Sequence, residues 1–354
     1  MFFGSLKDLV GIDIGSRAVK VVQLREGKGL WHLQAIGMAS LPPEAIVDNA
    51  IMDSSAVIDV VKGLLGTLNI AAKNVVTSIS GHSVIIRKIQ MPIMTEEELE
   101  NLIVFEAEQY IPFDITEVFL DFHIIGPDAN DATMMNVFLV AAKKDFVNDH
   151  IAIFRECGLT PMVMDIDSFA VQNAFELNYT VEEDDVVGIV NMGAGGMNVS
   201  VLKDGASIFT RDIQLGGNIL NEEIQKQFGL GSADAERAKL GQEIPGIERQ
   251  EVEEVIFSAT EMLAQEVQRS LDFFTATATD DKIHHLYITG GIAQLPQIRL
   301  ALENRLGIEV EILDPFRQIV VNEKDFESEY LKSIGPMFAV AVGLAMRRVG
   351  DKND

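Results

Sequence analysis

Cysteine is almost absent from the sequence, and so is any long apolar run. Cys157 is the one cysteine, so no disulfide can form within the chain, which fits a reducing compartment. Residues 334–346 are apolar but stay short of the roughly 18 to 20 residues that cross a bilayer, so they predict a buried helix. The first residues lack the basic and apolar regions of a secretory signal. We therefore expect a cytoplasmic protein.

Positive charge is also scarce. The 354 residues include 28 Lys and Arg against 54 Asp and Glu, which gives a net charge of −26. Nucleic acids and anionic lipids are bound largely through Lys and Arg, so neither is an expected partner. A nucleotide can still bind if backbone N–H groups and a metal ion offset its phosphate charge. With 47% hydrophobic residues, the chain reads as globular and is long enough for two domains.

The two halves of the sequence begin in the same way. Residues 10–24 read VGIDIGSRAVKVVQL, and residues 188–202 read GIVNMGAGGMNVSVL. Asn191 follows Asp13 by 178 residues (191 − 13), and the next Gly-containing turns keep this offset. Each half therefore opens with three strands joined by two turns and continues into helices and further strands. This pattern predicts two duplicated α/β domains that meet at a cleft.

Both first turns have the composition of a phosphate-binding loop. Gly15 and Ser16 form one turn and the small residues 193–196 form the other, so both backbones can approach a ligand closely. Asp13 ends the strand before the first turn, where its carboxylate can reach a magnesium ion. Two common alternatives fail. No G-x-x-x-x-G-K-[ST] occurs, and the G-x-G of the second turn leads into a strand rather than the helix of a dinucleotide fold.

At these residues the chain resembles the actin, Hsp70 and hexokinase superfamily. Residues 13–20 resemble the first phosphate loop, and residues 191–196 take the place of the second. Residues 288–291 (Ile-Thr-Gly-Gly) resemble the adenosine motif. Glu236 and Lys239 resemble the pair that contacts ribose and base, although a solvated helical face gives the same spacing. The resemblance implies ATP and Mg²⁺, with Asp13 at the metal. The implied nucleotide-binding residues are Asp13, Gly15, Ser16, Arg17, Lys20, Asn191, Gly193, Gly195, Gly196, Gly216, Gly217, Glu236, Lys239, Gly290, Gly291 and Ile292.

Within this superfamily the chain resembles the PilM family of type IV pilus assembly proteins over nearly its whole length. The resemblance rests on the order of segments 78–92, 106–113 and 209–217. It implies a cytoplasmic ATP-binding scaffold, peripheral to the inner membrane, that binds the N-terminal peptide of the inner-membrane protein PilN and meets other pilus components. Two alternatives stay open: a filament-forming protein similar to FtsA, and a kinase of small metabolites.

The resemblance implies an actin-like (RNase H-like) fold in which each half carries an insertion. The expected first domain is 1–81 with 161–180 and 334–354, the second is 181–217 with 283–333, the inserted α/β subdomain is 82–160, and a small subdomain over the nucleotide is 218–282.

The inserted subdomain is the expected partner site. A helix is predicted from Thr95 to Tyr110, because Thr95 and Glu98 have the spacing of a capping box. In the PilM family, the groove between this subdomain and the first domain takes the PilN peptide. Arg87, on the first strand of the insertion, can donate hydrogen bonds to an extended peptide, or it can simply face solvent on an edge strand.

Two residues bear on ATP turnover. Asn191 stands where most of the superfamily has Asp, and it lacks the charge that helps to hold magnesium. Asp167, at the head of a helix predicted over 168–177, resembles the water-positioning residue, but Asp is equally favoured as a helix N-cap. We therefore expect ATP to bind with slow or absent hydrolysis. The six histidines show no metal-ligand spacing.

Overall fold

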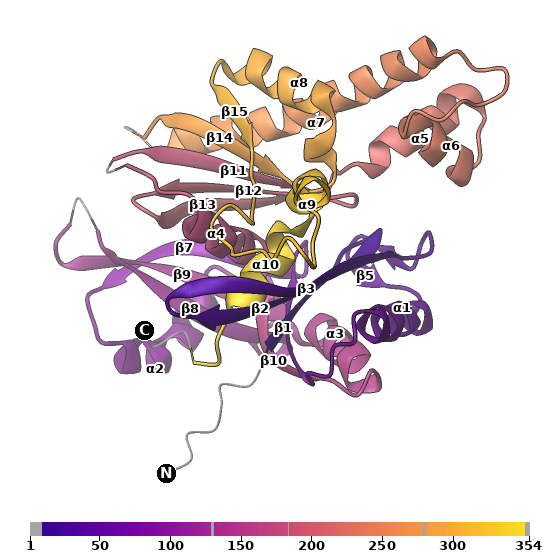
Figure 1. Ribbon diagram of the computed structural model, residues 1–354. Coiled ribbons are helices and arrows are strands. Elements are labelled where there is room, and N and C mark those ends of the chain that lie inside the picture. The colour runs from indigo at the N-terminus through magenta and orange to yellow at the C-terminus, as the bar shows by residue number, and fades with distance from the viewer. Residues whose placement is uncertain (1–8, 129–130, 183, 279–280, 351–354) are drawn as a thin grey trace.

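The computed structural model describes residues 9–128, 131–182, 184–278 and 281–350. Two five-stranded sheets form the centres of two lobes (Figure 1). The first sheet contains, in spatial order, β10 (Thr160–Ile166), β6 (Asn74–Ile79), β1 (Leu9–Ile14), β2 (Ala18–Gly27) and β3 (Leu30–Ser40). The second contains, in the matching order, β15 (Glu309–Ile312), β14 (Ile283–Thr289), β11 (Val186–Met192), β12 (Met197–Lys203) and β13 (Ala206–Ile213).

The two sheets share one topology. In each, the first three strands are antiparallel neighbours, and two later strands add in parallel beside the first. Asp13 pairs with Lys20 in the first sheet, and Asn191 pairs with Asn198 at the equivalent place in the second. The predicted duplication is confirmed in strand order, direction and register.

Two helices lie between the sheets, α4 (Asp167–Asn178) and α10 (Ala339–Met346), and α10 runs through the centre of Figure 1. The apolar residues of α10 are buried on every side, as predicted for this segment, after α9 (Ser328–Ile334) and the short η3 (Gly335–Phe338). Backbones approach closely here, because a Cβ at Gly343 would overlap the carbonyl oxygen of Ala170 in α4. None of the described helices is both long and apolar enough to span a membrane.

Further helices cover the outer faces of the two sheets. On the first sheet these are α1 (Ser54–Thr67) and α3 (Lys144–Glu156). On the second they are α5 (Asn218–Phe228), α6 (Ser232–Lys239), α7 (Arg249–Thr277) and α8 (Pro296–Leu306). The long α7 buries one residue every three or four positions, from Val252 to Phe274, as the apolar periodicity predicts.

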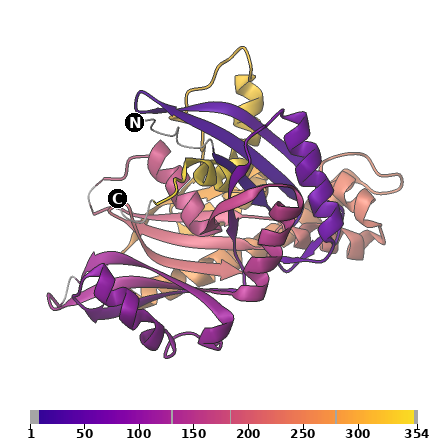
Figure 2. The same cartoon turned by 90° about the horizontal axis from the view of Figure 1, so that it is seen from below.

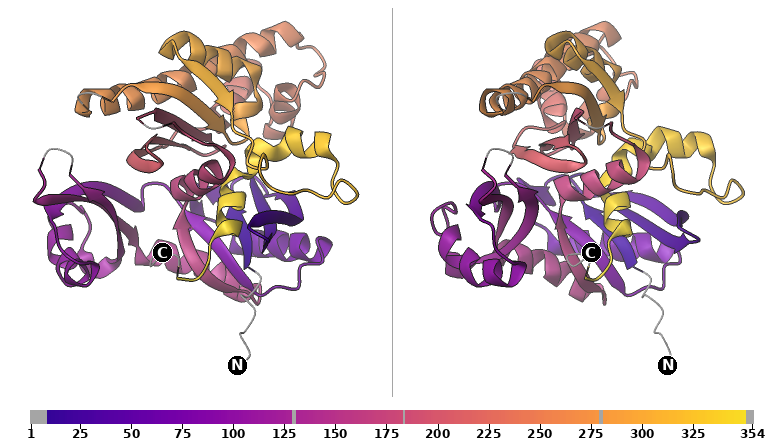
Figure 3. Two further views of the ribbon diagram at one scale, coloured as in Figure 1. Left: turned by 60° about the vertical axis from the view of Figure 1, so that its left-hand side comes forward. Right: turned by 90° about the vertical axis from the view of Figure 1, so that its left-hand side faces the viewer.

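The inserted subdomain is a separate three-stranded antiparallel sheet beside the first lobe (Figures 2 and 3). Its strands are β7 (Val84–Pro92), β9 (Met134–Lys143) and β8 (Val118–Pro127), the last preceded by η1 (Ile115–Glu117). Its core lies under α2 (Glu96–Ala107), where the predicted Thr95–Glu98 capping box is present. The predicted end at Tyr110 was wrong, because residues 108–110 form a turn.

The predicted domain boundaries stay a prediction, and their outermost residues, 1–8 and 351–354, lie outside the described chain. Packing favours one adjustment. Ile153 and Phe154 of α3 share a core with Val10 and Val57 of the first lobe. We therefore propose that the insertion ends near residue 143 rather than 160. A short hairpin of β4 (Ile46–Val47) and β5 (Ala50–Ile51) also borders the first lobe.

Candidate functional site

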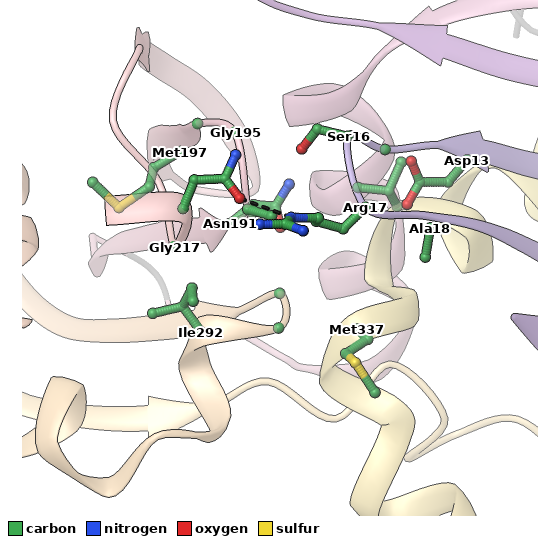
Figure 4. A pocket seen from close by; sticks show the side chains of 18 of the residues that line it. Asp13, Ser16, Arg17, Ala18, Asn191, Gly195, Met197, Gly217, Ile292 and Met337 are labelled. Atoms are coloured by element: carbon green, nitrogen blue, oxygen red, sulfur yellow. Dashed lines mark hydrogen bonds between the residues drawn. The ribbon is translucent and has the colours of Figure 1, made fainter. Parts of the chain in front are cut away.

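A cleft of about 880 Å³ lies between the two lobes. Figure 4 shows Asp13, Ser16 and Arg17 on one side of it, facing Asn191, Gly195 and Met197 on the other. Of the residues named from the sequence, it is lined by Asp13, Gly15, Ser16, Arg17, Lys20, Asp167, Asn191, Gly193, Gly195, Gly196, Gly217, Glu236, Lys239, Gly290, Gly291 and Ile292. Gly216 and Arg87 are not among its lining residues.

The first glycine turn joins β1 to β2. It is closed by a hydrogen bond from the Gly15 N–H to the Ala18 carbonyl at 3.1 Å. Behind the turn, Lys20 Nζ donates to Asp13 Oδ2 at 2.7 Å, and both side chains are largely buried. The Arg17 side chain crosses the cleft and donates from Nε to Asn218 Oδ1 of the second lobe at 2.9 Å (Figure 4).

The second turn is held from behind by the start of α5. The N–H of Gly217 donates to the Gly193 carbonyl at 3.0 Å, and the N–H of Asn218 donates to the Ala194 carbonyl at 2.8 Å. Gly216 lies under this turn, where a Cβ would meet three backbone atoms at 2.6 Å, so its role is to permit packing. Several N–H groups of the two turns donate to no other described residue, namely those of Ser16, Arg17, Ala194 and Gly195.

A third glycine segment, Gly290-Gly291, closes the far end of the cleft. Gly290 has φ +89°, and a Cβ there would overlap the Met192 carbonyl oxygen, so packing requires glycine. Gly291 is different. Its φ of −65° and ψ of −32° suit any residue, and a Cβ on it would have no atom within 4 Å.

Glu236 and Lys239 lie on α6 and face the cleft rather than open solvent. Lys239 Nζ donates to Glu236 Oε2 at 2.8 Å, and Asn221 Nδ2 donates to the same oxygen at 2.5 Å. Burial acts to raise the pKa of Glu236, but these hydrogen bonds hold it below its usual value. Arg249, which the sequence did not suggest, lines the cleft beside them and donates to the Ala238 carbonyl.

Asp167 is not a helix N-cap. It occupies the first position of α4, Ile166 precedes it as the cap residue, and no side chain caps this helix. Its carboxylate lines the cleft and accepts from Ser78 Oγ at 2.6 Å. Burial, with a smaller contribution from the charge of Asp13, raises the pKa of Asp167 from its usual 3.8 to about 6.

Sequence reasoning missed a row of polar groups that extends from Asn191. Asn191 Nδ2 donates to Asn198 Oδ1 at 3.0 Å, and Asn198 Nδ2 donates to Asp212 Oδ1 at 2.7 Å. The other Asp212 oxygen accepts from the N–H of Gly81 in the first lobe at 2.7 Å. One signal was available. Asn198 occupies the repeat position of Lys20, which faces Asp13.

Other candidates remain apart from the cleft. Arg87 is exposed on β7 and donates to its neighbour, the Ile86 carbonyl, at 3.2 Å. Within the described residues, no group of three or more His, Cys, Asp or Glu side chains is arranged to hold a metal ion.

A family model described as "Type IV pilus assembly protein PilM" matches residues 11–349 of the chain. Among solved structures, a chain of the "PilM-PilN type IV pilus biogenesis complex" is 31% identical, with a TM-score of 0.86, and the match covers 97% of this chain and 99% of that one. These likenesses confirm the resemblance on which the sequence prediction relied.

More distant relatives share the fold. Cell division protein FtsA of Escherichia coli (strain K12) is 24% identical over 386 residues, which covers 96% of this chain and 89% of FtsA. MreB5 of Spiroplasma citri, solved bound to AMPPNP, is 14% identical, with a TM-score of 0.52 over 96% of this chain and 95% of that one. The predicted actin-like fold class is thereby confirmed.

Proposed function

Since the chain belongs to the family described as Type IV pilus assembly protein PilM, we propose that it serves pilus assembly as an ATP-binding scaffold. Gly291 carries the ATP part of this proposal. It lines the cleft, yet neither its backbone conformation nor the surrounding protein requires glycine there. A flat ligand that lies against bare backbone does require it.

The two turns supply the phosphate site of this proposal. The two turns lie close together, since a Cβ at Gly195 would meet Ser16 Oγ at 2.9 Å, and their N–H groups donate to no other described residue. Such N–H groups bind anions well. Arg17 adds a positive charge between them. The base then lies at Gly291, with Glu236 and Lys239 near the sugar. The AMPPNP bound to the related MreB5 supports a nucleotide in this fold.

The residues present fit a magnesium ion bound with the phosphates. Asp13 and Asp167 both line the cleft, and Asp13 is close enough to raise the pKa of Asp167. A cation relieves the repulsion between two such poorly solvated carboxylates. Mg²⁺ usually takes one or two carboxylates and completes its shell with phosphate oxygens and water. Asp13 would be its main protein ligand through Oδ1, because Oδ2 accepts from Lys20 Nζ, and the ion would offset phosphate charge.

We propose slow or absent hydrolysis. Asp167 lines the cleft, and its pKa, raised to about 6, lies in the range that suits a general base at neutral pH. Asn191, however, brings no charge to the opposite wall of the cleft. Nucleotide occupancy, rather than rapid turnover, is then the useful property of the site.

The partner of the scaffold is the N-terminal peptide of a PilN protein. The relative with a TM-score of 0.86 is a PilM-PilN complex, which supports this choice. The apolar side chains at the junction between the inserted subdomain and the first lobe are only partly buried, and they include Ile86, Val140, Phe146, Ile151 and Met164. An extended apolar peptide would cover them. Arg87 shares the opposite face of β7 with Ile85 and Ile89, so we propose that this peptide is bound without it.

This partner also explains how the protein reaches the membrane. A net charge of −26 opposes direct contact with anionic lipids. We infer a cytoplasmic protein that is held at the inner membrane through the PilN peptide.

One pair of variants tests the ATP site. Gly291→Val places a side chain in the cleft at a position where a Cβ meets no atom within 4 Å. We expect ATP to bind about tenfold more weakly, a loss of about 1.4 kcal/mol. Gly231→Val is the matched control, because Gly231 also has an ordinary backbone conformation and open space around a Cβ but does not line the cleft. Isothermal titration calorimetry with ATP measures both. Equal ATP affinity in the two variants would refute the proposed site.

A second experiment tests the scaffold role. We expect a synthetic N-terminal PilN peptide to bind wild-type protein by calorimetry, and phosphate release from ATP to stay near background. Absence of peptide binding, together with transfer of phosphate to a small metabolite, would instead identify a kinase.

A further inference from the structure

The duplicated sheets place two equivalent rows of side chains on the cleft. In the first lobe the row is Asp13, Lys20 and Met38 on β1, β2 and β3. In the second it is Asn191, Asn198 and Asp212 on β11, β12 and β13. All six residues line the cleft. The first row keeps its carboxylate on the innermost strand, whereas in the second row the carboxylate lies two strands away.

Asp212 determines the direction of every hydrogen bond in the second row. A carboxylate only accepts, so Asn198 must turn its NH₂ toward Asp212, as the 2.7 Å bond shows. The carbonyl oxygen of Asn198 then faces Asn191, which must donate its own NH₂ at 3.0 Å. The remaining polar atom of Asn191, Oδ1, has no partner among the described residues, and Asn191 lines the cleft.

A second contact holds the Asp212 carboxylate in place. Its Oδ2 accepts from the backbone N–H of Gly81, which belongs to the opposite lobe and is buried. Gly81 has φ +93°, and Asn49 packs where its Cβ would be, so this N–H has little freedom to turn away. Both carboxylate oxygens are therefore used: a donor in place of Oδ1 requires Asn198 to turn over, and a donor in place of Oδ2 loses the bond to Gly81.

We propose that Asp212 is a positioning residue for the nucleotide site: through Asn198 it turns the carbonyl oxygen of Asn191, rather than its NH₂, toward the cleft. This inference rests on the proposed function. A carbonyl oxygen can coordinate Mg²⁺ or accept from its bound water, whereas an NH₂ group repels the ion. Asn191 thereby acts as a metal-side acceptor although it carries no charge.

The test measures Mg²⁺ affinity in Asp212→Asn. Asparagine at 212 can still accept from the Gly81 N–H only if its NH₂ group points to Asn198. The amides of Asn198 and Asn191 then both turn over, and Asn191 presents its NH₂ group to the cleft. We expect Mg²⁺ to bind the ATP-loaded protein about 10- to 100-fold more weakly, as for other groups that orient a metal ligand. Calorimetry and Mn²⁺ paramagnetic resonance measure this, while ATP affinity in EDTA and the melting temperature should match wild type.

Two further variants separate positioning from a structural role. Asp281→Asn is the control. Asp281 Oδ1 accepts from Lys203 Nζ at 2.7 Å, and Lys203 lies on β12 with Asn198, but Asp281 does not line the cleft. This variant should leave Mg²⁺ affinity unchanged. Asn198→Ala keeps the negative charge of Asp212 but removes its link to Asn191, so it should also weaken Mg²⁺ binding, which separates positioning from the loss of a charge near the ion.

The outcomes separate clearly. Wild-type Mg²⁺ affinity in Asp212→Asn overturns the inference, and so does an equal loss of metal-free ATP binding, which marks a change in cleft shape. If Asp212→Asn does not fold, Asn198→Ala cuts the same row without touching Gly81, and unchanged Mg²⁺ affinity there overturns it as well. Wild-type protein that binds no ATP overturns the proposed function, and this inference with it.

Discussion

Removal of the Asp167 charge should stabilise the protein at neutral pH. Burial raises the pKa of Asp167 from 3.8 to about 6. Between about pH 4 and pH 6 the folded state therefore keeps a proton on Asp167 that the unfolded chain has released. Stability therefore falls as the pH rises from about 4 to about 6 and then stays constant. Each pKa unit corresponds to about 1.4 kcal/mol, so the loss is about 3 kcal/mol at most, because a side chain that lines the cleft keeps some contact with water. Asp167→Asn avoids this loss.

Urea unfolding of wild type and Asp167→Asn between pH 4 and pH 8 measures the difference. Asparagine still accepts from Ser78 Oγ, which holds Asp167 at 2.6 Å in the wild type. We expect nearly equal stability near pH 4 and an advantage for the variant that grows to between about 1 and 3 kcal/mol above pH 6.

Asp53→Asn is the matched control. The Ala56 N–H and the Ser55 hydroxyl lower the pKa of Asp53, so this carboxylate favours folding above its usual pKa and loses that effect in acid. The control should therefore lose stability at neutral pH, the opposite sign. The reasoning is refuted if Asp167→Asn is less stable than wild type at pH 7. It is also refuted if the difference in unfolding free energy between the two proteins is the same at every pH.

Three further predictions concern packing and closure. Gly343→Ala should destabilise the protein by about 1 to 3 kcal/mol or more, because its methyl group overlaps the Ala170 backbone. The control Gly63→Ala, in an open part of α1, should stabilise the protein by about 0.5 to 1 kcal/mol. Equal urea unfolding midpoints for the two variants would contradict this prediction. Gly290→Ala should lower the melting temperature by calorimetry, since it adds strain at φ +89°. Arg17→Ala removes a bond across the cleft, so small-angle scattering should show a more open apo protein; an unchanged profile counts against it.

The features that sequence reasoning found are those encoded locally. Both glycine turns of the cleft follow a strand directly and consist of small residues, so strand pattern and glycine content identify them together. The capping box of α2 is likewise a spacing of three residues between Thr95 and Glu98. Even Gly216 was recognised as special, although its glycine serves packing behind the second turn rather than the ligand.

The features that it missed depend on residues far apart in the chain. Asp212 meets Gly81 from another lobe, and Arg17 meets Asn218 across the cleft; no local pattern encodes either distance. Asp167 shows the same limit differently. An Asp at a helix start has the same sequence whether it caps the helix or faces a cleft, and only the packing of α4 decides.

The two rows of the cleft have a consequence for how any ligand sits. A cleft between two identical lobes would bind an elongated molecule equally well in either of two opposite orientations. In this cleft, one wall presents the Lys20–Asp13 ion pair and the Met38 thioether. The other wall presents the amides of Asn191 and Asn198 and, two strands away, the carboxylate of Asp212. The two walls of the cleft therefore differ in charge and in hydrogen-bonding groups, and we expect a bound molecule to prefer one of the two orientations.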